Sequence, residues 1–348
     1  MIRLSSKLEK KHIDTLDFLR GIAALSVVLF HFSNSTLPTI KPNPLGDFFS
    51  LGNLGVQVFF VISGFVIPYS MYQSGYTLPN AFRFLAKRMV RLGPPSWIAM
   101  ALMAIIYYGA IQLNGKPIEG MDWPGNDWTA ILGNMFYAYA SAGIGTFYSV
   151  LWTLEVELQY YLLIAFLLPL LVAPQQKAEI ILLILAAVAL TFFLNDSNII
   201  FFKYNSLFIM GILVFLFKIG KIDRKLMSIA CCVIVAVCHA QLGYLSASSG
   251  AITLLIITFV NFKNGVAQWL GMISYSLYIT HHFAGISTEF IVKKFLFTSD
   301  TDSSKVLLLF LYTAIALTFA HFFYKWVEKP FIRLASKIKF KEKAVNRG

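Results

Sequence analysis

An arginine and a histidine stand on one apolar segment near the N-terminus. The segment LRGIAALSVVLFHF, at 19–32, reads as a membrane helix except for Arg20 and His31. Their separation corresponds to about 1100° of helical rotation, so the two side chains share a face about 16 Å apart along the axis. Ionisable groups at membrane depth are costly and usually functional. We expect both to face one cavity; the alternative is a snorkelling arginine and a satisfied core histidine.

Two glutamates interrupt a second apolar segment, LWTLEVELQYYLL at 151–163. Glu155 and Glu157 are about 200° apart around a helix, so at most one of them can be central to a single site. Glu157 shares a face with Tyr161, four residues further on. A carboxylate here suits the orientation of a histidine that accepts a proton. The alternative is that each glutamate pairs with an interfacial cation.

Basic residues form a third group, in FLAKRMVRLGPPSW at 84–97. Arg88 and Arg91 lie three residues apart on one helical face, where paired guanidinium groups suit a phosphate or a diphosphate. The alternative is the ordinary cluster of positive charge on the cytoplasmic side of a membrane protein. On physical grounds alone, that alternative is favoured.

A polar stripe marks the segment LGMISYSLYITHH at 270–282. The stripe contains Ser274, Tyr275, Tyr278 and His281, and each could form an interhelical hydrogen bond. His281 and His282 are adjacent, so their side chains diverge by about 100° and make a poor chelate. The other histidines are scattered over separate segments. We therefore predict no metal site.

The elements that position these groups are membrane helices. Of the 348 residues, 57% are hydrophobic and only 13% are charged, whereas soluble proteins carry about 25% charged residues. The composition predicts an all-α, multi-pass membrane helix bundle. Ten spans are expected, near 15–34, 53–72, 96–113, 147–172, 178–194, 204–218, 226–240, 246–262, 268–292 and 305–327.

The charge distribution orients this bundle. With ten spans, most lysines and arginines fall on one side, which predicts that both termini are cytoplasmic. The formal net charge of +12 then reflects membrane topology, and no nucleic-acid partner is expected. We expect one membrane domain, 1–335, in the inner (plasma) membrane, followed by a basic tail, 336–348. The segment 114–146 is expected to cover an extracytoplasmic cavity.

Six sequence blocks, in order, resemble the integral-membrane acyltransferase family 3, which includes bacterial O-antigen and exopolysaccharide acetylases. Arg20 and His31 match its R-x10-H signature, and Glu157 matches the acid of its W-S-L-x-x-E block, in which Thr153 replaces the usual serine. His281 matches the histidine of its Y-S-x-Y-x-x-H block. The remaining blocks are GVQVFFVISGF at 55–65, RMVRLGPPSW at 88–97 and WVEKPF at 326–331.

The resemblance implies transfer of an acyl group, usually acetyl, from cytoplasmic acyl-CoA to a hydroxyl of a cell-surface or lipid-linked carbohydrate, such as lipopolysaccharide. Arg88 and Arg91 would hold CoA phosphates, and Arg20 would bind a deeper part of the donor. His31 would be the general base or a transient acyl carrier, and Glu157 would orient it or a second donor.

Four further residues are expected to contact substrate: Tyr161, Ser274, Tyr278 and His281. Acyl-CoA would be consumed as a substrate, so no permanently bound cofactor is expected. The alternative is a transporter or flippase that uses the same cations to bind an anionic substrate without acyl transfer. The absence of an internal sequence repeat weighs against that alternative.

Overall fold

The structure is a computed structural model. The residues that it describes are 14–36, 44–115, 127–139, 141–144, 148–174, 177–195, 197–295 and 301–340. The N-terminal 13 residues and the end of the basic tail lie outside the described residues, as do parts of the segment 114–146. The cytoplasmic placement of the termini, and the division at residue 335, therefore stay predictions.

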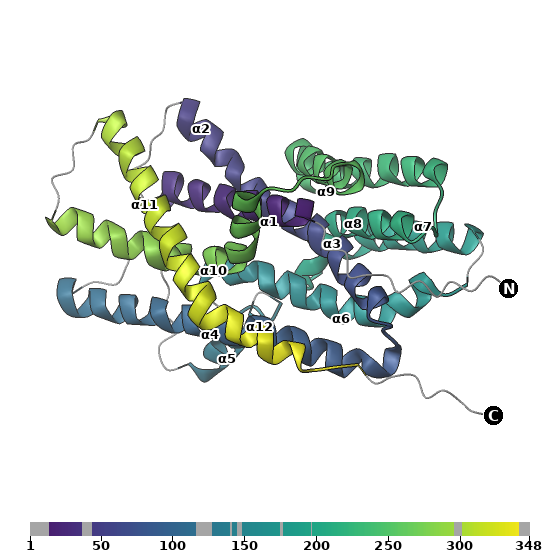
Figure 1. Ribbon diagram of the computed structural model, residues 1–348, viewed down its shortest axis with the longest axis horizontal. Coiled ribbons are helices and arrows are strands. Elements are labelled where there is room, and N and C mark those ends of the chain that lie inside the picture. The colour runs from purple at the N-terminus through teal and green to yellow at the C-terminus, as the bar shows by residue number, and fades with distance from the viewer. Residues whose placement is uncertain are drawn as a thin grey trace.

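Every regular element in the described residues is helical, as the composition predicts (Figure 1). The α-helices are α1 (Asp14–His31), α2 (Pro44–Ser50), α3 (Gly55–Gln73), α4 (Ala81–Asn114), α5 (Trp128–Met135), α6 (Trp152–Val172), α7 (Lys177–Leu194), α8 (Asn205–Lys218), α9 (Arg224–Phe259), α10 (Gly265–Phe295), α11 (Asp302–Phe323) and α12 (Lys329–Ser336).

Six of the described segments are long and apolar enough to cross a membrane. They are Asp14–Asn34, Gly46–Gln73, Leu78–Leu113, Ser149–Val172, Arg224–Phe259 and Ser303–Ser336. Helices form at all ten expected positions, but the count of ten spans is not confirmed. The apolar helices Glu179–Leu194 and Asn205–Lys218 are shorter than the roughly 20 residues that a span needs. Helix α10 is long, but hydroxyl and imidazole groups interrupt its apolar surface.

Helix α9 differs from the expectation of two separate spans at 226–240 and 246–262. The structure has one helical stretch, Arg224–Phe259, which is broken at Gly243. Gly243 has φ 81° and ψ 171°, a backbone conformation that a residue with a Cβ rarely adopts. The break lies between the two expected segments, because hydropathy locates apolar stretches but does not show whether a loop separates them.

The helices that carry the polar groups pack closely. Helix α1 runs along α10 and also contacts α3, while α3 packs against α8 (Figure 1). The α3–α8 contact depends on small residues: a Cβ at Gly64 would lie 2.2 Å from the Phe208 carbonyl oxygen, and one at Gly211 would lie 2.2 Å from that of Val61. Glycine therefore lets the two backbones touch, and α3 also packs against α6.

Candidate active site

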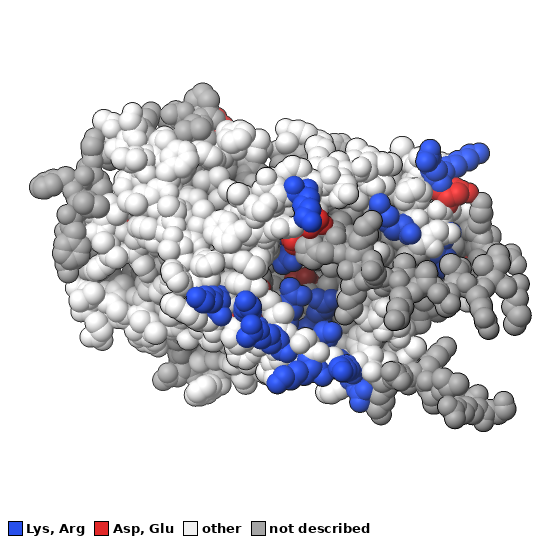
Figure 2. Space-filling view, viewed as in Figure 1, with Lys and Arg blue, Asp and Glu red and all other residues white. Residues whose placement is uncertain are grey.

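A cavity of about 130 Å³ lies among α1, α3, α4, α6 and α10. A water molecule needs at least about 10–15 Å³ of such space, so the cavity can hold several waters or part of a substrate. Its polar lining residues are Arg20, Ser63, Arg88, Arg91, Thr153, Glu157, Tyr161, Ser274, Tyr275 and Tyr278. Figure 2 shows a hollow with basic and acidic atoms inside it, beside a row of Lys and Arg that follows α12.

Glu157 points into this cavity and is held there by two hydroxyl groups. Tyr161 donates a hydrogen bond to Oε1 at 2.5 Å, and Ser63 of α3 donates to the same atom at 3.1 Å. Hydrogen bonds to a charged acceptor are about twice as strong as those between neutral groups. The Glu157 carboxylate is therefore fixed by α3 and by its own helix. No hydrogen bond joins it to His31 in the described residues.

Glu155 lies on the other side of α6 and does not line the cavity. It is fully buried. Its Oε1 accepts hydrogen bonds from the Ser141 backbone N–H at 2.8 Å and from the Ser141 hydroxyl at 2.6 Å. Gln159 joins this network, and its Oε1 accepts from the Phe201 N–H. Glu155 thus holds the segment that contains Ser141 against α6. Of the two glutamates, Glu157 faces the cavity.

Helix α4 supplies two guanidinium groups to the cavity. Arg88 lies over the ring of Phe84 at 5.5 Å and over that of Tyr161 at 5.3 Å, which holds its side chain by cation–π attraction. The Arg91 Nε is buried and has no hydrogen-bond partner among the described residues. A buried donor without an acceptor costs free energy. This donor is therefore available to an anion or a carbonyl oxygen of a ligand.

Arg20 of α1 supplies a third positive charge to the same lining. It interacts electrostatically with Glu157 and with Glu328, a buried residue that accepts a hydrogen bond from Ser276 of α10 at 2.6 Å. The charged lining of the cavity therefore consists of three arginines and one glutamate. This excess of positive charge suits an anionic ligand.

Helix α10 forms another wall of the cavity. Tyr275 donates to the Leu92 carbonyl of α4 at 2.7 Å. The hydroxyl oxygen of Tyr278 accepts from Thr153 at 3.0 Å, and its hydrogen is donated to the Val150 carbonyl at 3.1 Å. Ser274 donates within its own helix, to Gly271 at 2.8 Å. The polar stripe predicted from the sequence thus joins α10 to α4 and α6 around the cavity.

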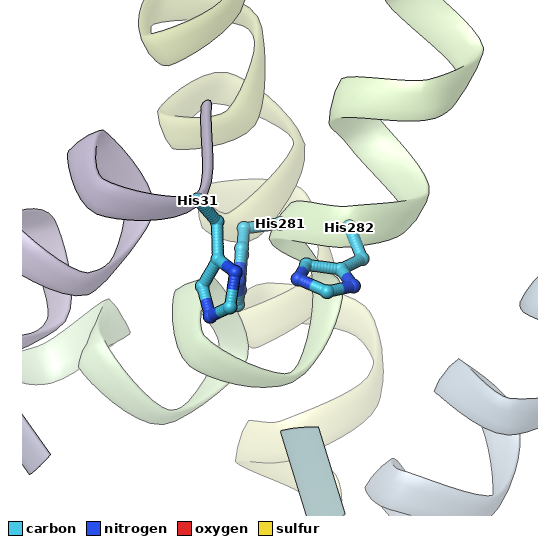
Figure 3. Close-up of side chains that lie close together, drawn as sticks. All are labelled: His31, His281 and His282. Atoms are coloured by element: carbon cyan, nitrogen blue, oxygen red, sulfur yellow. The ribbon is translucent and has the colours of Figure 1, made fainter. Parts of the chain in front are cut away.

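His31 lies outside the lining of this cavity and instead contacts the two histidines of α10 (Figure 3). Ring centroids are 5.1 Å apart for His31 and His281, and 4.5 Å apart for His31 and His282. Candidate ligand nitrogens of the three rings all lie within 4.8 Å of one another. We name this group, His31, His281 and His282, the histidine cluster.

The histidine cluster changes two expectations. Arg20 lines the cavity but His31 does not; Phe59 and Tyr278, whose ring centroids are 5.9 Å apart, belong to the same lining as Arg20. Three of the six histidines also come together, from α1 and α10. The divergence of His281 and His282 is real, but His31 from α1 packs against both rings.

Tyr278 connects the cavity to the histidine cluster. Its side chain lines the cavity, and its backbone carbonyl accepts a hydrogen bond from His281 Nδ1 at 2.7 Å. Sequence reasoning singled out neither Ser63 nor His282 as a site residue. The available signals were a hydroxyl within the apolar stretch of α3 and a second histidine beside His281, but neither indicates a partner on another helix.

Comparisons with known proteins identify the family of this chain. Residues 13–325 match a protein family described as an acyltransferase domain. The chain is 25% identical over 170 residues to a peptidoglycan O-acetyltransferase of Listeria monocytogenes, an alignment covering 47% of this chain and 25% of that protein. It is 30% identical over 167 residues to nodulation protein 10 of Rhizobium leguminosarum, covering 45% and 44%. The chain thus spans less than half the length of both relatives. No solved structure matches it.

Proposed function

We propose an O-acyltransferase activity, because the chain belongs to the acyltransferase family 3 and is a multi-pass membrane protein. The donor is acyl-CoA, most simply acetyl-CoA, and the acceptor is a hydroxyl of a cell-surface or lipid-linked carbohydrate. The observation that carries the proposal is the juxtaposition of an arginine-rich cavity and the histidine cluster, joined by Tyr278. The listerial relative is a peptidoglycan O-acetyltransferase by name, and because peptidoglycan contains carbohydrate chains, this likeness supports the acceptor class.

The arginines would bind the donor. Arg88 and Arg91 would take its phosphate oxygens, for which guanidinium groups are well suited. Arg20 of α1 would contact a polar group of the donor that lies between the phosphates and the thioester. Glu157 would limit repulsion among the three cations and would hold the Tyr161 hydroxyl toward the donor. This role replaces the expected orientation of His31 by Glu157.

The histidine cluster would act on the acceptor. A nitrogen of His31 would accept the proton of the acceptor hydroxyl as its oxygen attacks the thioester carbonyl. The new C–O bond forms, the C–S bond breaks, and the CoA thiolate leaves and takes up a proton. His281, whose Nδ1–H is held by the Tyr278 carbonyl, would bind the acceptor together with Ser274 and Tyr278. We favour this direct transfer over an acyl-histidine intermediate.

Mass spectrometry of surface glycans tests the proposal. Cells with the native protein, with His31→Ala and with no protein are compared. We expect a mass increment of one acyl group that requires both the protein and His31, and the increment identifies the acyl chain. Equal modification in all three strains would refute the proposal. A labelled acyl-protein that is trapped in the native enzyme and lost in His31→Ala would instead establish the covalent route.

A further inference from the structure

The histidine cluster holds more imidazole nitrogens than the proposed proton transfer uses. His282 has no role in that reaction, yet its ring packs against both other rings, with centroids 4.5 Å from each (Figure 3). The Nε2 atoms of His281 and His282 are buried and have no hydrogen-bond partner among the described residues. Buried polar atoms without partners are uncommon in folded proteins, and they call for a ligand or another explanation.

The hydrogen bonding of His281 fixes which of its nitrogens can act as a ligand. Its Nδ1 lies 2.7 Å from the Tyr278 carbonyl oxygen. A carbonyl oxygen can only accept, so Nδ1 carries the hydrogen, and Nε2 of the neutral ring carries the lone pair. Histidines that bind metal ions typically donate their other N–H to a carbonyl or carboxylate in this way. The His281 ring is therefore held in place and completely buried, and its Nε2 atom carries the lone pair that could bind a ligand.

We propose that His31, His281 and His282 form a binding site for one divalent transition-metal ion of the Zn²⁺ class. Each ring offers one nitrogen, and these atoms lie within 4.8 Å of one another. Tetrahedral Zn²⁺ with bonds of about 2.0–2.1 Å requires nitrogens about 3.4 Å apart. The longest separation must shorten by about 1.4 Å, which rotations of the His31 and His282 side chains would provide, since the His281 ring is held by the Tyr278 carbonyl.

The donor set determines which ions fit. Three neutral imidazoles suit Zn²⁺, Co²⁺, Ni²⁺ and Cu²⁺, whereas Mg²⁺ and Ca²⁺ require oxygen ligands. Three protein ligands also leave a fourth position open for water or substrate. The backbone around the cluster is held on two sides, because Tyr148 donates to the Ile279 carbonyl and Tyr278 is fixed by Thr153.

Metal binding and the proposed acyl transfer would compete for His31. A metal ion that engages the nitrogen of His31 leaves it unable to accept a proton from the acceptor hydroxyl. Zn²⁺ is therefore expected to inhibit transfer, and this consequence rests on the proposed function. The binding itself does not rest on it, because it requires neither donor nor acceptor.

Titration of the purified full-length protein in detergent tests the site. The protein is first treated with a chelator and then titrated with Co²⁺, whose visible absorption reports tetrahedral coordination, and Zn²⁺ is added to displace it. We expect one saturable ion per chain and at least tenfold weaker binding in both His282→Gln and His282→Ala. The matched control is His239→Gln, at an exposed histidine of α9, which should bind as the native protein does.

The wild-type spectrum tests the site even if a variant does not fold. Absence of saturable Co²⁺ binding by the native protein would overturn the proposal, and so would unchanged affinity in folded His282→Gln. In transfer assays, inhibition by Zn²⁺ should require at least tenfold more Zn²⁺ in His282→Gln. Transfer without metal binding would refute only this inference, whereas metal binding without transfer would refute only the proposed function.

Discussion

Replacement of Arg91 by glutamine separates ligand binding from folding. The Arg91 Nε is buried in the cavity lining without a hydrogen-bond partner among the described residues. We therefore expect its bonds to form mainly with the acyl donor. A hydrogen bond from a charged group contributes about 1.5–3 kcal/mol, and each 1.36 kcal/mol is a factor of ten. Arg91→Gln should thus raise the KM for the donor about 10- to 150-fold.

The same substitution should not destabilise the protein. Arg91 repels Arg20 but attracts the buried Glu328, so removing its charge changes two opposing interactions. The thermal unfolding temperature in detergent should therefore change little. A large loss of affinity without a loss of stability distinguishes a binding residue from one that supports the fold.

The assay measures transfer from labelled acetyl-CoA in permeabilised membranes as the donor concentration varies. Arg83→Gln is the matched control, because Arg83 lies on the same helix but outside the cavity lining, and its described hydrogen bond is a 3.5 Å contact with the Lys339 carbonyl. A KM in Arg91→Gln that matches this control would refute the donor site. A large loss of thermal stability would refute the claim that Arg91 serves the ligand.

Three further substitutions test the architecture around the site. Glu155→Leu removes a buried acceptor and should lower the unfolding free energy by about 1–3 kcal/mol, as followed by thermal unfolding. Gly64→Ala should destabilise the protein by about 1–3 kcal/mol in the same measurement, because its Cβ would lie 2.2 Å from the Phe208 carbonyl oxygen. The control Gly109→Ala should not destabilise it, because nothing lies within 4 Å of a Cβ at that position. Tyr161→Phe should lower the transfer rate at least about tenfold, since its hydroxyl bonds a carboxylate, and an unchanged rate would contradict the assigned role of this hydroxyl.

The placement of Glu155 and Glu157 on opposite sides of their helix could be predicted from the sequence alone. Positions two apart on a helix point in nearly opposite directions, and the structure places Glu157 in the cavity and Glu155 in a separate network. The helices themselves could also be located, because long apolar segments form helices wherever backbone groups cannot bond to water. These inferences need only the geometry of one helix.

The histidine cluster could not be predicted in this way. The angle between His281 and His282 follows from their adjacency, but the third ring comes from α1, which is far away in the sequence. Only the packing of α1 along α10 brings His31 to them. The break at Gly243 lies in the expected gap between 226–240 and 246–262, but hydropathy does not show whether two apolar segments are joined by a loop or by one residue with positive φ.

The most direct test of the account follows a labelled acetyl group from acetyl-CoA into membrane-associated carbohydrate. Permeabilised membranes that contain the native protein, His31→Ala or Arg91→Gln are compared at one low donor concentration. We predict label in carbohydrate with the native protein, none with His31→Ala, and a signal with Arg91→Gln that recovers when more donor is added. Equal labelling by the native protein and His31→Ala would contradict this prediction.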